Sequence, residues 1–326
     1  MRLTRSSLAV ANAVVLLAAF AGVSGATAGQ ETAIDSAHAS FGGSSGGLGA
    51  PTGRETCGQR DNGCIRTYQH GAIVWTPATG AMPVWGAIRA AWEAEAAEEG
   101  PLGYPVEAPV CGDGSCRQHF QRGLITWSPS TGAAVQRDID DPASVGAVVN
   151  KQRPFGPADY APADLVPAGG STLRAEAADA FSRMQADAAA AGVDLALVSA
   201  YRSYSAQSAV YDSYVARYGV EAADRISARP GHSEHQSGLA ADVGAADGSC
   251  QLQACFAQTP AGQWVEANAH RFGFIVRYPE GAEPVTGYAY EPWHLRYVGD
   301  SMAAGLRASG AGTLETYLGL APAPGY

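Results

Sequence analysis

The sequence has few charged residues, and among them basic residues are scarce. Asp, Glu, Lys and Arg make up 16% of the 326 residues, and 21 basic side chains stand against 31 acidic ones, which gives a net charge of −10. Nucleic acids and anionic lipids are bound chiefly through Lys and Arg. We therefore expect no nucleic-acid partner, whereas a zwitterionic peptide substrate is compatible with this charge.

A hydrophobic run long enough to span a bilayer is also missing. The apolar stretch at residues 8–23 is shorter than the roughly 20 residues that a membrane helix needs. Arg2 and Arg5 precede it, and an Ala-x-Ala pattern at residues 26–28 follows, as in a secretory signal peptide. An uncleaved membrane anchor is the alternative. We expect residues 1–28 to be a cleaved signal peptide, and the protein to be secreted, either extracellular or associated with the cell wall.

The sequence contains no Cys-x-x-Cys pair of the kind that holds zinc through thiolates. Its six cysteines form three close pairs instead, and each pair encloses a short loop. These pairs are Cys57/Cys64, Cys111/Cys116 and Cys250/Cys255. A thiolate metal site is the alternative, but local disulfides in an oxidising compartment are the simplest arrangement. We predict three disulfides.

The first half of the chain contains an internal repeat. Residues 29–56 are rich in Gly, Ser, Ala and Thr, which predicts a flexible linker. Residues 68–84 then align with residues 120–136 at a constant offset of 52, and the same offset carries Cys64 onto Cys116. Each copy has a Gly-led apolar strand and a Pro-x-Thr-Gly turn, and a short amphipathic helix lies between the copies. We assign residues 57–136 to a repeat module.

The second half is expected to fold as a small α+β domain, in which helices accompany an antiparallel sheet. Residues 137–144 are polar and predict a second linker, and residues 145–326 form the domain itself. Apolar periodicity favours alternating helices and strands in this region. The predicted helices are 172–191 and 205–217, and the predicted strands are 193–200, 274–278 and 294–298.

Two of the seven histidines lie in contexts that suggest a metal site. They occur in Ser233-Glu-His235-Gln-Ser-Gly-Leu-Ala-Ala-Asp242 and in Glu291-Pro-Trp-His294. Two imidazoles and one carboxylate are the usual ligands of a hydrolytic zinc site that leaves one position for water. Glu291, three residues before His294, is near enough to act as a general base. Each motif alone is more often a surface or core feature, so the case depends on their combination.

The combined pattern Ser-x-His-x-x-Gly-x-Ala-x-Asp and Glu-x-x-His resembles the VanY-type D-alanyl-D-alanine carboxypeptidases of the LAS metallopeptidase group. Residues 150–154, 159–166 and 199–207 match in the same order, and the resemblance covers roughly residues 145–305. It implies a zinc peptidase with one Zn²⁺ per chain. The implied zinc ligands are His235, Asp242 and His294; the implied catalytic residues are the base Glu291 and the oxyanion partner Arg202; the implied substrate-binding residues are Arg202, Gln207 and Ser233.

The repeats have a resemblance of their own. Residues 102–105 (Leu-Gly-Tyr-Pro) and 71–75 (Gly-Ala-Ile-Val-Trp) resemble the LGFP repeat of secreted wall proteins. Tyr104 stands where the name of the repeat has phenylalanine, which is a conservative aromatic change. The resemblance implies attachment to a component of the cell envelope. A module that only spaces the catalytic domain from the surface is the alternative.

Together these features predict a secreted zinc-dependent carboxypeptidase that hydrolyses the terminal D-Ala-D-Ala bond of peptidoglycan stem peptides. The attacking water would be activated by the metal, with Glu291 as general base. The alternatives are an L,D-carboxypeptidase, a peptidoglycan endopeptidase or a non-catalytic wall-binding protein. Cys250 and Cys255 fall in an insert after Asp242, and a closed loop there would border the cleft and change which peptides fit.

Overall fold

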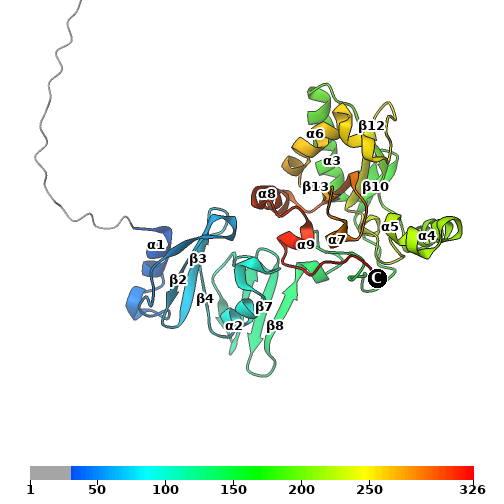
Figure 1. The fold of residues 1–326 in the computed structure, drawn as a ribbon. Helices are drawn as coiled ribbons and strands as arrows, with labels where there is room; N and C mark the ends of the chain where they lie inside the picture. The colour runs from blue at the N-terminus through cyan, green and yellow to red at the C-terminus, as the bar shows by residue number, and fades with distance from the viewer. Residues whose placement is uncertain (1–30) are drawn as a thin grey trace, which may run out of the picture. The chain divides into compact units, whose positions relative to one another are not determined.

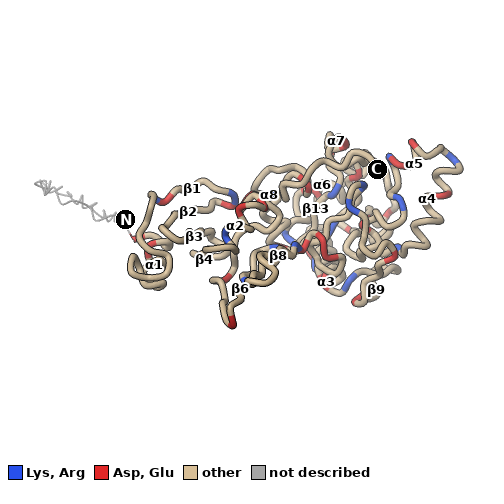
Figure 2. Tube along the Cα trace, turned by 90° about the horizontal axis from the view of Figure 1, so that it is seen from below, with Lys and Arg blue, Asp and Glu red and all other residues tan. Residues whose placement is uncertain are grey.

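The computed structural model describes residues 31–326, and the predicted signal peptide at residues 1–28 lies outside them. The described chain has two β-rich repeats followed by an α+β domain (Figure 1), which confirms the predicted fold class. Acidic and basic residues are interspersed along it (Figure 2). Among residues 31–326, no helix has both the length and the apolar character that a membrane crossing requires.

Each repeat is a four-stranded antiparallel sheet whose strands are neighbours in sequence order. The first sheet comprises β1 (Thr56–Gln59), β2 (Gly63–Tyr68), β3 (Gly71–Thr76) and β4 (Gly80–Trp85). The second comprises β5 (Val110–Gly112), β6 (Ser115–Phe120), β7 (Gly123–Ser128) and β8 (Gly132–Arg137). Adding the offset of 52 to β2, β3 and β4 gives the bounds of β6, β7 and β8. The sequence repeat is therefore a repeat of structure.

One helix covers each sheet. Helix α1 (Ala33–Ser40) packs on β3 and β4, and α2 (Gly86–Ala94) packs on β7 and β8. Ile34 of α1 and Leu48 are buried in the same apolar cluster as strand residues of the first sheet. The flexible linker predicted at residues 29–56 is therefore wrong for most of its length, because its few apolar side chains complete the core of the first repeat.

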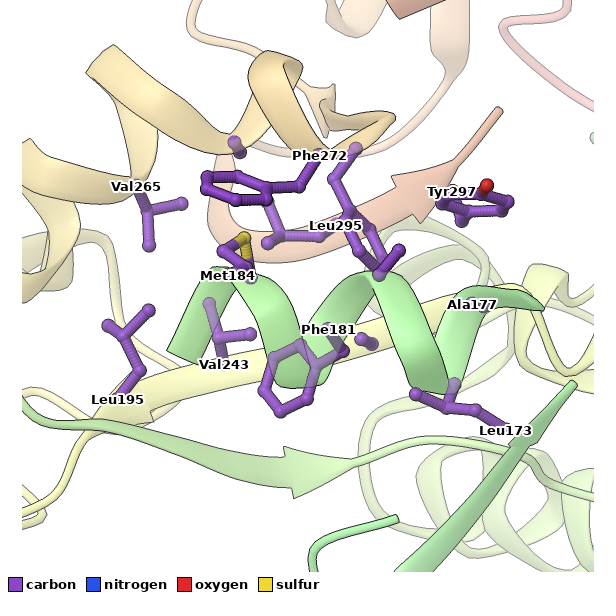
Figure 3. Packing of buried hydrophobic residues seen from close by; sticks show 14 of the residues in the cluster. Leu173, Ala177, Phe181, Met184, Leu195, Val243, Val265, Phe272, Leu295 and Tyr297 are labelled. Atoms are coloured by element: carbon purple, nitrogen blue, oxygen red, sulfur yellow. The ribbon is translucent and has the colours of Figure 1, made fainter. Parts of the chain in front are cut away.

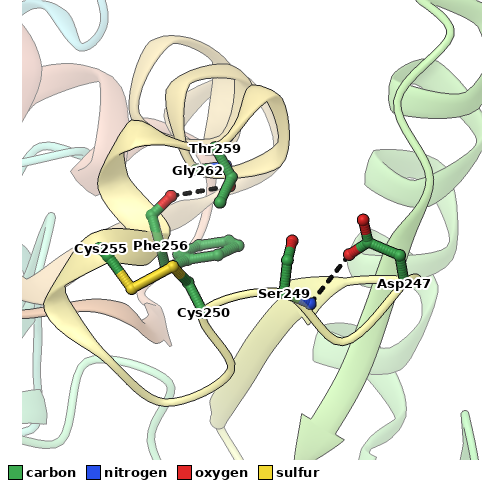
Figure 4. Close-up of a disulfide and its surroundings, with 7 residues drawn as sticks. All are labelled: Asp247, Ser249, Cys250, Cys255, Phe256, Thr259 and Gly262. Atoms are coloured by element: carbon green, nitrogen blue, oxygen red, sulfur yellow. Dashed lines mark hydrogen bonds between the residues drawn. A yellow bond between two sulfur atoms is a disulfide. The ribbon is translucent and has the colours of Figure 1, made fainter.

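The three predicted cysteine pairs are disulfides in the structure. Cys57 faces Cys64 across β1 and β2, and Cys111 faces Cys116 across β5 and β6. The pair Cys250–Cys255 closes a loop of the second domain beside the buried ring of Phe256 (Figure 4).

The second domain is built on an antiparallel sheet with strand order β11-β12-β14-β13. Its strands are β11 (Leu195–Ser199), β12 (Ala240–Ala245), β13 (Phe274–Tyr278) and β14 (Glu291–Tyr297). Helix α3 (Ala175–Ala190) packs its apolar side on this sheet, where Phe181 and Met184 lie against the buried Val243 and Leu295 (Figure 3). The helix predicted from residue 172 starts at Ala175, because residues 171–174 pair with β9.

The remaining elements surround this sheet. They are β9 (Leu165–Ala168), β10 (Ser171–Arg174), α4 (Tyr204–Tyr218), α5 (Val220–Ile226), α6 (Pro260–Asn268), α7 (Glu283–Thr286), α8 (Asp300–Ser309) and α9 (Leu314–Tyr317). The predicted linker 137–144 is not free of structure. A 3-10 turn spans Asp138–Asp140, and Ile139 is buried against Val148, so an apolar side chain anchors this segment to the second domain.

Candidate active site

The register of two strands brings Asp242 and His294 together. Asp242 on β12 lies directly opposite His294 on β14 in the antiparallel pair. Directly opposed residues of such a pair have Cβ atoms about 5 Å apart. Here the Nδ1 atom of His294 lies 2.9 Å from Oδ1 of Asp242. Backbone pairing alone therefore places an imidazole beside a carboxylate.

A tight turn before β12 adds His235. This residue lies in a short 3-10 helix (Glu234–Ser237), which ends at Gly238 with φ of 68°. A Cβ atom at Gly238 would come within 2.8 Å of Leu165 and 3.1 Å of Arg174, so the motif requires glycine for both its backbone angle and the available space. The turn directs Nε2 of His235 to within 3.2 Å of Oδ2 of Asp242.

The three side chains form a buried cluster that can hold a metal ion. One ligand atom from each of His235, Asp242 and His294 lies within 4.8 Å of the others. Nδ1 of His235 donates to the carbonyl of Ala200 at 2.6 Å, which leaves its Nε2 lone pair directed at the cluster. Because both imidazoles present a nitrogen and Asp242 presents an oxygen, the donor set fits Zn²⁺.

The electrostatics of the cluster favour a positive charge at this point. Burial alone would lower the pKa of His294, but its contacts with the carboxylates of Asp242 and Glu234 outweigh burial and raise the pKa to about 10. Burial would raise the pKa of Asp242, yet the two imidazoles hold it far below its usual range. A cation bound here would meet a carboxylate that is already ionised.

Glu291 begins β14 and lies at the edge of the cluster. One of its carboxylate oxygens is 4.0 Å from Nδ1 of His294. Burial raises the pKa of Glu291 to about 7; the charges of His294 and Arg202 oppose the shift, and the Asp242 carboxylate adds to it. The predicted base thus lies beside the predicted ligands without being hydrogen-bonded to them.

Arg202 and Gln207 form a hydrogen-bonded pair. Nη1 of Arg202 donates to Oε1 of Gln207 at 2.8 Å, and Nη2 donates to the hydroxyl of Ser199 at 3.3 Å. The Gln207 amide in turn donates to the Ala228 carbonyl at 2.7 Å. Both polar groups of Gln207, which is 1% exposed, are engaged within the protein. These contacts place Gln207 where it can orient Arg202, and its predicted contact with substrate stays a prediction.

The predicted metal, catalytic and substrate residues all line one cleft of about 490 Å³, within the size range of ligand sites. They are Arg202, Gln207, Ser233, His235, Asp242, Glu291 and His294. Trp293 both lines this cleft and packs on the core of the domain. Their common location agrees with the predicted site, and the role of each residue stays a prediction.

Comparison with known proteins identifies the family. Residues 170–300 match the sequence model of VanY, D-alanyl-D-alanine carboxypeptidase, and residues 48–100 and 102–139 match that of the LGFP repeat. YodJ of Bacillus subtilis (strain 168), whose name calls it a carboxypeptidase, is 41% identical over 55% of this chain and 68% of its own length. The chain belongs to the VanY family of D-alanyl-D-alanine carboxypeptidases. The predicted class of enzyme, a carboxypeptidase of this type, is thereby confirmed.

Two further comparisons are informative. The D-alanyl-D-alanine carboxypeptidase of Enterococcus faecium is 42% identical over 38% of this chain, and the match spans only 37% of that protein's length. Among solved structures, the LD-carboxypeptidase LdcB superposes with a TM-score of 0.52 at 40% identity, covering 55% of this chain and 88% of that chain. Relatives with different bond preferences thus share this domain.

A set of buried charges behind the site was not predicted from the sequence. Nε2 of His294 faces Oε2 of Glu234 at 3.5 Å, on the side of the ring away from Asp242. The other Glu234 oxygen accepts from Nε of Arg277 at 2.8 Å and from Nη1 of Arg296 at 3.1 Å. Arg277 also pairs with Glu315 at 2.6 Å. A carboxylate behind a metal-binding histidine orients the ring.

This group (Glu234, Arg277, Arg296 and Glu315) is almost entirely inaccessible to solvent. Burial alone would raise the pKa of Glu234, but the two arginines hold it far below its usual range. The sequence did carry a sign of this group, since Arg277 interrupts the otherwise apolar strand β13 and Arg296 lies between the buried Leu295 and Tyr297 of β14. A charge in such a strand is rarely buried without a partner.

Replacing Arg277 with methionine should strongly destabilise the protein. The substitution keeps most of the side-chain volume but leaves two buried carboxylates short of a partner, a loss of about 3–5 kcal/mol. Urea denaturation of the full chain measures the free energy of unfolding. Arg271→Met is the matched control, because its pair with Asp187 is exposed and is worth below about 1 kcal/mol. Equal losses in the two variants would contradict a stabilising role for the buried group.

Proposed function

We propose that the protein is a secreted zinc-dependent carboxypeptidase that removes the terminal D-alanine from D-Ala-D-Ala-ending stem peptides of peptidoglycan. The observation that carries this proposal is the cluster of His235, Asp242 and His294, with Glu291 and Arg202 in the same cleft. Membership of the VanY family supports the choice of substrate.

Each of these residues has a separate role in the proposed reaction. The cluster would hold one Zn²⁺, which supplies Lewis-acid activation of the attacking water. Glu291 accepts a proton from this water as the new C–O bond forms and then delivers it to the nitrogen of the departing D-alanine as the peptide C–N bond breaks. Arg202 stabilises the negative charge that develops on the carbonyl oxygen, and Gln207 holds its guanidinium in place.

A second candidate is an L,D-carboxypeptidase, which would remove the last D-alanine of a tetrapeptide. The similarity to the LD-carboxypeptidase LdcB favours it, because that structure shares both the fold and 40% of the aligned residues. The cluster and the base would perform the same chemistry on either bond. The difference must therefore lie in contacts on the substrate side of the cleft.

The proposed location is the cell envelope. The export features of residues 1–28 and the three disulfides support secretion. The two LGFP matches support association of the repeats with an envelope component. On this proposal, the repeats keep the enzyme close to its substrate.

Digestion of defined stem peptides tests the proposal. The full chain is loaded with zinc and incubated separately with a tripeptide, with a tetrapeptide, and with a pentapeptide that ends in D-Ala-D-Ala. The products are identified by mass spectrometry. We expect the pentapeptide to lose one D-alanine, and a chelator to abolish the reaction. Release of D-alanine from the tetrapeptide alone would replace this proposal with the L,D-activity, and cleavage of none of the three would refute both.

A further inference from the structure

The loop closed by Cys250–Cys255 carries an exposed leucine into the cleft. Leu252 lines the same cleft as the catalytic cluster, yet 43% of it is exposed. It lies between the two cysteines of the disulfide shown in Figure 4. An aliphatic side chain left open to water inside a ligand cleft is typical of a surface that a ligand covers.

A second exposed aliphatic residue lines the same cleft. Ile226 at the end of α5 is 46% exposed, and Val210 and Tyr214 of α4 line the cleft with it. None of these side chains belongs to the metal cluster or to the Arg202–Gln207 pair. The cleft therefore has an apolar part, contributed by α4, α5 and the disulfide loop, in addition to its catalytic part.

The backbone of the loop holds Leu252 in place. Cys250 and Leu252 both have φ of 53°, a region that residues with side chains seldom adopt. The disulfide closes the loop, Cys250 packs on the core of the domain, and Phe256 beyond Cys255 is fully buried. A side chain presented in a fixed position loses little entropy when a ligand covers it.

We propose that Leu252, together with Ile226, forms a subsite for the aliphatic side chain of the substrate residue that precedes the D-Ala-D-Ala unit. This inference rests on the proposed carboxypeptidase function. A carboxypeptidase that releases one terminal residue can gain additional contacts only on the N-terminal side of the cleaved bond. The apolar part of the cleft is then available to that side of the peptide, and Leu252 selects for aliphatic carbon there.

The test compares two tripeptides that differ only in this residue. The probes are diacetyl-L-Lys-D-Ala-D-Ala, with a long aliphatic side chain, and acetyl-Gly-D-Ala-D-Ala, with none. The variant is Leu252→Gly, which removes the side chain and also relieves the positive φ, so the fold is not endangered. Val220→Ala is the matched control, because Val220 is 52% exposed on α5 but does not line the cleft.

We expect Leu252→Gly to lower kcat/KM for the lysyl peptide about tenfold and to leave the glycyl peptide within about twofold, as loss of a hydrophobic contact predicts. Val220→Ala should change neither. Calorimetry can measure binding of both peptides to zinc-loaded Glu291→Gln chains without any turnover. These chains should prefer the lysyl peptide. The preference should be lost when Leu252→Gly is added.

The results separate the two proposals. If the wild-type chain cleaves neither peptide, the carboxypeptidase proposal fails, and the calorimetric preference still decides the subsite. If the wild-type chain cleaves both peptides but Leu252→Gly affects them equally or not at all, the subsite is overturned and the carboxypeptidase function stands.

Discussion

Glu291→Gln is expected to abolish nearly all turnover while the protein keeps its zinc. The amide has the shape of the carboxylate but cannot accept the proton of the attacking water. General-base catalysis contributes about 10²–10⁴-fold, so kcat should fall by about this factor. Hydrolysis of the D-Ala-D-Ala-ending pentapeptide measures the loss, and atomic absorption measures the zinc content.

Glu266→Gln provides the matched control for this change. Glu266 is an exposed residue of α6, and its only ion pair among the described residues is a 3.7 Å contact with the exposed Arg307. This variant should keep wild-type turnover. Near-normal activity of Glu291→Gln would remove Glu291 from the mechanism, and loss of zinc from that variant would give it a structural role instead.

Replacing any one of the three predicted ligands with alanine is expected to remove both zinc and activity. The sites differ in position, since His235 lies in the turn, Asp242 on β12 and His294 on β14, but each supplies one donor of the same buried cluster. With two donors left, the chain should hold close to no zinc after dialysis. Turnover should be lost in proportion to the zinc.

Thermal stability gives a readout that does not depend on activity. A ligand that binds only the folded state stabilises it by RT ln(1 + [L]/Kd), which is about 4 kcal/mol when the free ligand concentration is a thousand times Kd. Adding zinc should therefore raise the Tm of the metal-stripped wild-type chain and leave the three variants unchanged. His270→Ala should respond as the wild type does, because His270 lies outside the cluster. A variant that still gains stability from zinc would exclude its residue as a ligand.

Much of the fold was predictable because its causes are local. The offset of 52 predicted two copies of one structural unit, and β6, β7 and β8 follow β2, β3 and β4 by this offset, since each copy repeats the same alternation of apolar residues and turns. The strand at 274–278 was predicted with its observed bounds from its apolar run. Cysteine spacing similarly predicted the three disulfides, because the partners are only five to seven positions apart.

The features that could not be predicted from the sequence depend on contacts between residues that are distant in the chain. Composition indicated a flexible linker at residues 29–56, but Ile34 and Leu48 are buried because the first repeat sheet offers them an apolar face. The substrate role of Gln207 stays a prediction, and its contacts with Arg202 and Ala228 could not be read from the sequence because they join separate segments. Glu234 lies within the recognised motif, but its arginine partners come from strands more than forty residues further along the chain.

The sequence by itself determined the kinds of residue that the site contains and the order in which the motifs occur. It also determined the glycine that allows the turn after His235, because that requirement lies in one residue's backbone. Tertiary structure alone decided that Asp242 meets His294, since these residues are 52 positions apart and the register between β12 and β14 joins them. It also decided that the disulfide loop brings Leu252 into the cleft, because position in a cleft depends on packing between elements and not on local pattern.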